Sequence, residues 1–226
     1  MLPAIQFPQN DLAGSTAQPL LDSTGGAFGP YAGQIFVAEF SHPRILRVAL
    51  EKVGGVYQGA CFLFLEGNGL RRGNNRLAFG PDGSLYVAQV SRLWGGTGEG
   101  LQRVVWTGRT PMDILTMSLL EDGFELAFTK PVDPATASSP SAYSLHHYYY
   151  LYHATYGSPK QEATPVLVTD VSISEDRRRV RLAVPSLVPR RVYDLRPRGI
   201  RAVDGDPLVT RVAAYTLNAK PHSSPR

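Results

Sequence analysis

Residues 76–90, RLAFGPDGSLYVAQV, decide the fold, because they hold two short apolar runs on either side of a tight turn. The runs are 77–79 and 85–88, and Gly80-Pro81-Asp82-Gly83 joins them. Proline presets the backbone for the second position of a turn, and an Asp-Gly pair tolerates the positive φ that closes it. The stretch therefore predicts a β-hairpin.

The composition is that of a globular chain of many short strands. The 226 residues suit one large or two ordinary domains, and 43% of them are apolar. The 18 prolines and 22 glycines are typical of frequent turns. The formal charge is +4, with 9 basic and 7 acidic residues before Pro111 and 14 and 12 after it. Because the basicity is spread evenly, the charge gives no reason to expect nucleic acid.

The sequence shows neither a transmembrane segment nor the pattern of a signal peptide. No apolar run of about 18 residues exists, so we expect no transmembrane segment. The start, MLPAIQFPQND, lacks the basic and apolar regions of a signal peptide. Two explanations are open: a cytosolic protein, or a piece of a longer exported chain whose start lies elsewhere.

Apolar runs recur along the first half of the chain. Strands are expected at 33–40, 44–51 and 56–65, and after the hairpin at 101–107 and 113–120. The pattern repeats after about 45 residues, and four-stranded meanders of that length are typical of propeller blades. Two blades cannot close a ring and would leave open sheet edges. This favours the interpretation as a piece of a longer protein.

The pattern changes at Gly123. About seven short strands with turn signals between them follow, which predicts a β-sandwich of the immunoglobulin (Ig) kind. We therefore expect an all-β chain with terminal β-propeller blades at 1–111, an Ig-like β-sandwich at 112–220 and a frayed tail at 221–226.

The sequence GPDGSLYVAQ, which follows RLAFG, resembles the blade signature of the glucose/sorbosone dehydrogenase-like propellers, a group that includes quinone-dependent sugar dehydrogenases. Residues 29–51 and 57–69 resemble the penultimate blade of the large multidomain bacterial members, in which propellers are joined to c-type cytochrome modules. Residues 122–145, 168–184 and 193–208 resemble a bacterial Ig-like module.

The resemblance implies a periplasmic or extracellular parent protein that uses pyrroloquinoline quinone and calcium. In that family the catalytic base and most quinone contacts come from earlier blades, so we assign no catalytic residue here. We expect a non-catalytic C-terminal fragment that serves as a scaffold or interaction module, with the remaining blades or other modules as partners. One alternative is a carbohydrate or envelope-partner binding module. Another is part of a quinone-dependent sugar oxidoreductase that acts only with the missing blades.

Three residues are candidates for contact with the quinone. Arg71 and Arg72 have forked guanidinium groups that suit carboxylates, which the quinone carries. His42 ends a strand, in a loop of the kind that faces a propeller channel. A role for His42 needs a carboxylate partner or a metal co-ligand within reach. The alternative for Arg71 and Arg72 is a solvated loop between blades. The alternative for His42 is an ordinary histidine in a turn.

Aromatic residues are the candidates for ligand binding. Trp94 could stack on a sugar, and it could equally fill the interface between blades. The Tyr-rich region 143–156 could form a surface for sugar or partner contact, through His147, Tyr148, Tyr149 and Tyr150. Neighbours on a strand alternate faces, so adjacent histidines cannot chelate one metal, and we expect no metal site. Ordinary packing is the alternative for this region.

Nine arginines lie between residues 177 and 201, and Arg177, Arg179 and Arg181 share one face of a strand. We interpret them as a solvated outer face that also guards an edge strand. The alternative is a polyanion site, whose binding would weaken with salt. No interleaved aromatic residues support a groove for single-stranded nucleic acid.

Overall fold

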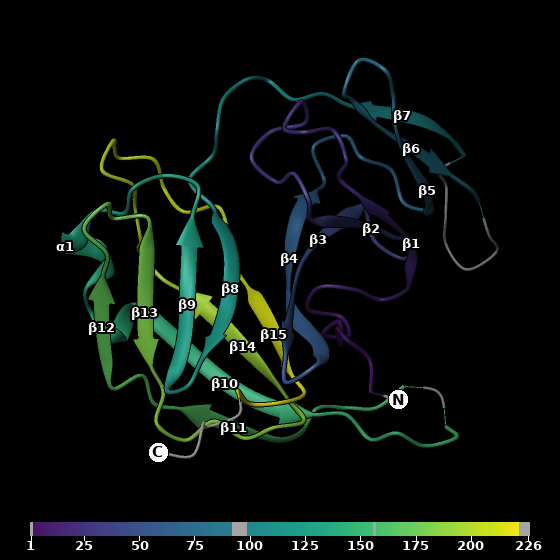
Figure 1. Ribbon diagram of the computed structural model, residues 1–226. Coiled ribbons are helices and arrows are strands. Elements are labelled where there is room, and N and C mark those ends of the chain that lie inside the picture. The colour runs from purple at the N-terminus through teal and green to yellow at the C-terminus, as the bar shows by residue number, and fades with distance from the viewer. Residues whose placement is uncertain (1, 92–98, 156, 222–226) are drawn as a thin grey trace. The chain divides into compact units, whose positions relative to one another are not determined.

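The computed structural model describes residues 2–91, 99–155 and 157–221, and in them the chain is all-β (Figure 1). The helices of these ranges are short: α1 is Pro134–Ala137, and the 3-10 turn η1 is Pro140–Ala142. Among the described residues, no helix is long and apolar enough to cross a membrane. The chain divides into two compact units. Unit 1 holds Met1–Gln6, Leu50–Ala60 and Pro111–Arg226, and unit 2 holds Phe7–Ala49 and Cys61–Thr110.

Unit 2 is built from antiparallel strands that follow one another in the chain. β1-β2-β3-β4 are consecutive strands at one end of an eight-stranded sheet, and β5-β6-β7 form a separate three-stranded sheet. Their bounds are β1 Thr16–Leu21, β2 Ile35–Glu39, β3 Arg44–Val53, β4 Val56–Glu66, β5 Asn74–Phe79, β6 Leu85–Gln89 and β7 Gly100–Val104.

The predicted hairpin at 76–90 is confirmed as β5 and β6. The Gly83 amide donates to the Gly80 carbonyl at 3.0 Å, and Gly83 has a φ of 73°. Asp82 holds the turn with its carboxylate, which accepts from the Ser84 amide at 3.1 Å. The apolar pattern assigned 113–120 to this meander, whereas the expected domain boundary placed it in the part 112–220; β8 (Ile114–Leu120) pairs with β9 (Gly123–Phe128) in unit 1 and not with the meander.

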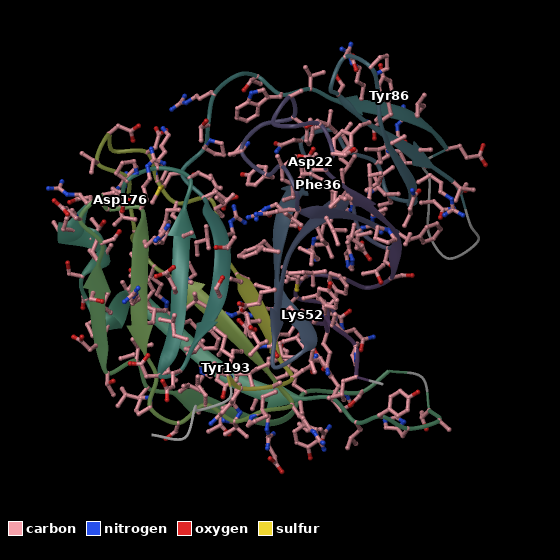
Figure 2. All side chains as sticks on the ribbon, in the orientation of Figure 1. Asp22, Phe36, Lys52, Tyr86, Asp176 and Tyr193 are labelled. Carbon is pink, nitrogen blue, oxygen red and sulfur yellow. The ribbon has the colours of Figure 1, made fainter. Side chains whose placement is uncertain are left out.

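Aromatic side chains form the core of unit 2. Phe36, labelled in Figure 2, lies edge-on to Phe28 and Phe64, with centroid distances of 5.5 and 4.7 Å. Buried Arg47 lies 4.5 Å from the centroid of Tyr31 and 4.3 Å from that of Phe62. The aromatic faces thus contribute cation–π interactions that offset the cost of burying this charge.

Unit 1 contains facing sheets. One sheet has the order β12-β13-β9-β8, and the other includes β15-β14-β10-β11. The new strands are β10 Tyr143–Tyr149, β11 Gln161–Val166, β12 Asp170–Ile173, β13 Arg179–Ala183, β14 Arg191–Pro197 and β15 Ala213–Leu217. Figure 1 shows β12, β13, β9 and β8 side by side as one layer. Phe124 of that layer contacts Tyr193 and Tyr215 of the other at centroid distances of 5.3 and 5.2 Å. The arrangement is β-sandwich-like.

The tip of the β3–β4 hairpin belongs to unit 1. The buried Tyr215 hydroxyl of β15 donates to Glu51 at 2.5 Å and accepts from the Gln58 amide at 2.7 Å. The Asn218 amide donates to the Gln58 oxygen at 2.9 Å. Residues 50–60 are therefore held to β15 by buried hydrogen bonds, each of which is costly to leave unmade.

Candidate anion-binding groove

A groove lies on the outer face of the sheet β12-β13-β9-β8 in unit 1. Antiparallel pairing sets Ser172 of β12 opposite Arg181 of β13, and Arg181 opposite Glu125 of β9. Side chains of directly opposite residues share a face, so these three form a row across the strands. Arg179 lies two residues from Arg181 and faces the same way. The inward alternates, such as Val180 and Leu182, are buried in the core.

One carboxylate serves two guanidinium groups in this row. Arg181 Nε lies 3.0 Å from Glu125 Oε2, and Arg179 Nε lies 4.0 Å from Glu125 Oε1. The arginine side chains are 64% and 61% exposed, whereas Glu125 is 22% exposed. A guanidinium has five N–H donors, so most of the donors of this pair face solvent.

The groove has a volume of about 280 Å³ and is lined by Glu125, Ser172, Ile173, Ser174, Arg179 and Arg181. We call these residues the arginine groove. Two arginines and one glutamate give its lining a net positive charge. The serine hydroxyls can donate and accept hydrogen bonds beside the guanidinium groups. The arrangement suits an anion that also carries hydrogen-bonding groups.

A tight turn sets one end of the groove. The Ser174 hydroxyl donates to Asp176 Oδ1 at 2.6 Å, and the Arg178 amide donates to the same oxygen at 3.1 Å. Asp176, labelled in Figure 2, lies in this turn between β12 and β13. The Ser174 hydroxyl and the Arg178 amide hold the pKa of Asp176 below its usual value. Arg177 completes the turn with a φ of 57°. The turn thus starts β13 in the register that points Arg179 and Arg181 outward.

Unit 2 places a carboxylate beside His42, the partner that a functional role needs. His42 Nδ1 lies 3.1 Å from Glu39 Oε2. Glu39 is fully buried and also accepts from the amides of Gly14 at 2.9 Å, Ser15 at 2.6 Å and Ser41 at 3.2 Å. The carboxylate fixes the orientation of the imidazole. Its many amide donors indicate that its main task is to hold the loop between β2 and β3.

Arg71 lies in a different network from His42. Its guanidinium Nη1 donates to the Glu99 carbonyl at 2.9 Å, and its amide donates to the Gln102 side chain at 2.7 Å. Gln102 in turn accepts from Gln89 at 2.9 Å. Arg72 is exposed. No described contact brings His42, Arg71 and Arg72 together in one quinone pocket, so that role stays a prediction.

The Tyr-rich region has different neighbours on the two faces of β10. On one face Tyr148 is buried, with Lys160 Nζ 4.3 Å from its ring centroid and Tyr150 5.4 Å away. On the other face Arg191 lies 4.5 Å from the Tyr149 ring. Tyr148 and Tyr149 are therefore not parts of one aromatic surface. Trp94, the other predicted sugar contact, lies outside the described residues.

His147 lies on the same face of β10 as Tyr149, whose ring is contacted by Arg191 of β14. Its ring lies 5.5 Å from that of Tyr193 in β14. Within the described part of the chain, its buried Nδ1 has no hydrogen-bond partner. Burial, followed by the charge of Arg191, lowers the pKa of His147, while Glu162 opposes the shift. The neutral imidazole is thus the form that the fold favours.

The described residues hold no cluster of three or more His, Cys, Asp or Glu side chains that could bind a metal ion. The Asp204-Gly205-Asp206 turn has a lysine as its counter-ion. Lys130 Nζ lies 2.8 Å from Asp204 and 2.6 Å from Asp206. The pKa of Lys130 is raised by hydrogen bonds to these carboxylates, mainly to Asp204.

Sequence reasoning singled out the arginines of the groove and missed Glu125, Ser172 and Ser174. The alternation of β9 and β13 could have placed Glu125 and Arg181 on outward faces. It could not have shown that they are opposite each other, because β9 and β13 are far apart in the sequence and their register is a tertiary property.

Comparisons with known proteins were made for the whole chain. No protein-family model matches it. No curated protein matches it either. Among solved structures, the bacterial surface-layer protein SbsC, residues 31–844, is 23% identical with a TM-score of 0.37 over 48% of this chain and 14% of that one. The N-terminal part of SbsC is 22% identical with a TM-score of 0.37 over 49% of this chain and 25% of that one. The chain thus spans a quarter or less of these proteins, and at such TM-scores no function is transferred.

Proposed function

We propose that the chain is a non-catalytic interaction module that binds an acidic macromolecule through the arginine groove. One observation carries the proposal. Arg179 and Arg181 share a single carboxylate, that of Glu125, while their guanidinium groups remain 61% and 64% exposed. A pair of guanidinium groups with spare donors, beside serine hydroxyls, is suited to carboxylate, sulfate or phosphate groups.

An Ig-like fold for unit 1 is part of the proposal, and the strand order supports it. Read in chain order as A to G, β8, β9, β13 and β12 take the places A-B-E-D, while β10, β14 and β15 take C-F-G. The Tyr193 hydroxyl adds support, because it accepts from the Val188 amide at 2.6 Å, five residues upstream. Ig-like domains contain such a tyrosine corner at the strand F position. Recognition through exposed faces is common among such modules.

For unit 2 we propose blades of a propeller that resembles the sugar dehydrogenases, in a parent that is periplasmic or extracellular. The support is the consecutive antiparallel order of β1 to β4 and of β5 to β7, although β4 also pairs with β15 and the second sheet has three strands where a blade has four. A quinone-dependent activity with further blades remains a second proposal, whose only structural support is the carboxylate beside His42.

The test of the interaction module is a set of titrations of the whole chain with two acidic polymers, polygalacturonate and polyphosphate, and with neutral dextran. We expect at least one acidic polymer to bind, with an affinity that falls as salt rises, because exposed charges are screened. Dextran is expected not to bind. If neither acidic polymer binds even at low salt, the proposed function is wrong.

A further inference from the structure

We propose that Glu125 makes the arginine groove selective for an acidic polysaccharide, a polymer whose sugar units carry both carboxylates and free hydroxyl groups. This inference rests on the proposed function and names the class of its ligand. It starts from the row Ser172–Arg181–Glu125, in which hydrogen-bond donors and acceptors alternate across neighbouring strands.

The acceptors of the groove match hydroxyl groups. Glu125 has two carboxylate oxygens, and its side chain is 22% exposed. Ionised carboxylates only accept hydrogen bonds, so a ligand must donate to be attracted to them. Sugar hydroxyls can donate. The oxygens of a phosphate chain carry charge and only accept, and the chain has no hydroxyl groups along its length that could donate to Glu125, so its contact with Glu125 is repulsive.

The donors of the groove match a ligand of low charge density. Arg179 and Arg181 lie two residues apart on one strand, about 7 Å by the rise of a strand. Duplex nucleic acid carries one charge per about 1.7 Å of its axis. Only a small part of so dense a charge could be neutralised by two arginines. A carboxylate on each sugar of a chain is closer to what the pair can neutralise.

The balance of charges around the groove also favours a ligand of low charge density. The arginines of β13 and its turn are balanced in number by acidic residues on the same strands and turn: Arg177, Arg178, Arg179 and Arg181 stand with Glu125, Asp170, Glu175 and Asp176. The long-range field of this surface is therefore weak, and attraction is confined to direct contacts. A densely charged polymer gains little from such a surface.

The experiment compares the wild-type chain with Glu125→Gln, each titrated with polygalacturonate and with polyphosphate at equal molar charge. We expect wild type to bind polygalacturonate more tightly. In Glu125→Gln we expect polyphosphate binding to improve by about two- to fivefold, the range of one exposed charge contact. The ratio of the two dissociation constants should thus fall. Glu162→Gln is the matched control, because Glu162 also pairs with an arginine, Arg191, at 2.7 Å, and lies outside the groove.

The control is expected to keep the wild-type ratio. Two results would overturn the inference: wild type binding polyphosphate as tightly as polygalacturonate, and Glu125→Gln leaving the ratio unchanged while its thermal unfolding matches wild type. In either case an acidic polymer still binds, so the proposed function stands. Absence of binding to both polymers would instead remove the proposed function itself.

Discussion

Arg181 of β13 donates from Nε to Glu125 of β9 at 3.0 Å, across two strands that are paired in the sheet and far apart in the sequence. The pair is exposed on the arginine side and shared with Arg179. Exposed ion pairs contribute only about 0–1 kcal/mol to stability. The pair therefore contributes little to the stability of the sheet.

The hydrogen bonds between residues 50–60 and β15 predict that their loss lowers the stability of the fold. Tyr215→Phe removes the hydroxyl that donates to Glu51 and accepts from Gln58. Because Gln58 is fully buried, the variant leaves a buried polar group with a lost partner. We expect the free energy of unfolding to fall by about 1–3 kcal/mol, measured by urea denaturation. Tyr57→Phe is the control, because Tyr57 is exposed, and it should change the value by less than about 0.5 kcal/mol. Equal effects of the two variants would contradict the claim that the Tyr215 hydroxyl stabilises the contact with residues 50–60.

Alanine substitutions at Gly73 and Gly69 distinguish the cost of a steric clash from the cost of backbone strain. Both have positive φ, 79° and 83°. A Cβ at Gly73 would lie 2.3 Å from the Val90 carbonyl oxygen, whereas a Cβ at Gly69 meets nothing within 4 Å. Gly69→Ala should cost about 1–2 kcal/mol, the cost of a left-handed residue. Gly73→Ala should cost clearly more, because backbone must move as well. Thermal unfolding of the two variants tests this, and a similar loss in both would show that the contact with Val90 relaxes freely.

Burial of His147 predicts a dependence of stability on pH. The folded chain holds the pKa of His147 below its ordinary value of about 6.5, chiefly by burial and then by the charge of Arg191. Around and below pH 6.5 the unfolded chain binds more protons at this residue than the folded chain does. The stability that goes with a neutral His147 is therefore fully present above about pH 6.5, and it is lost as the pH falls toward the lowered pKa. In His147→Gln the decrease in melting temperature between about pH 7.5 and pH 5 should be smaller than in the wild-type chain. An unchanged slope in the variant would show that other groups cause the fall.

Much of the fold could be predicted from local patterns. The hairpin at 76–90 was predictable because its turn chemistry and its apolar runs agree. β2, β3 and β4 were predicted in place by apolar runs and by the Gly and Pro residues between them. β11 has no strand pattern in the sequence, since residues 161–166, QEATPV, are mostly polar and contain a proline. This strand forms because its backbone pairs with β10, which no local pattern shows.

The candidate site was less predictable than the fold. The sequence indicated that Arg179 and Arg181 share a face of β13. It was wrong to place Arg177 on that strand, because Arg177 lies in the preceding turn, and wrong to expect an edge strand, because β13 lies between β12 and β9. The sequence pattern showed neither the carboxylate that Arg179 and Arg181 share nor the serines beside them, because those contacts depend on the pairing of β9, β12 and β13. The partner of β8 could not be predicted for the same reason, since an apolar strand fits either a meander or a sandwich until its partner is known.

The central claim is that the arginine groove is the binding site. The most direct measurement is the affinity of polygalacturonate for wild type, for the double variant Arg179→Gln and Arg181→Gln, and for Arg211→Gln. Arg211 is an exposed arginine outside the groove lining, so its variant measures the effect of losing one positive charge elsewhere on the surface, and a purely electrostatic effect would be about twice as large in the double variant. We expect the double variant to lose about tenfold or more in affinity, since charge-assisted hydrogen bonds are lost, and Arg211→Gln to stay close to wild type. Equal losses in the double variant and in Arg211→Gln, or no loss in either, would contradict the claim.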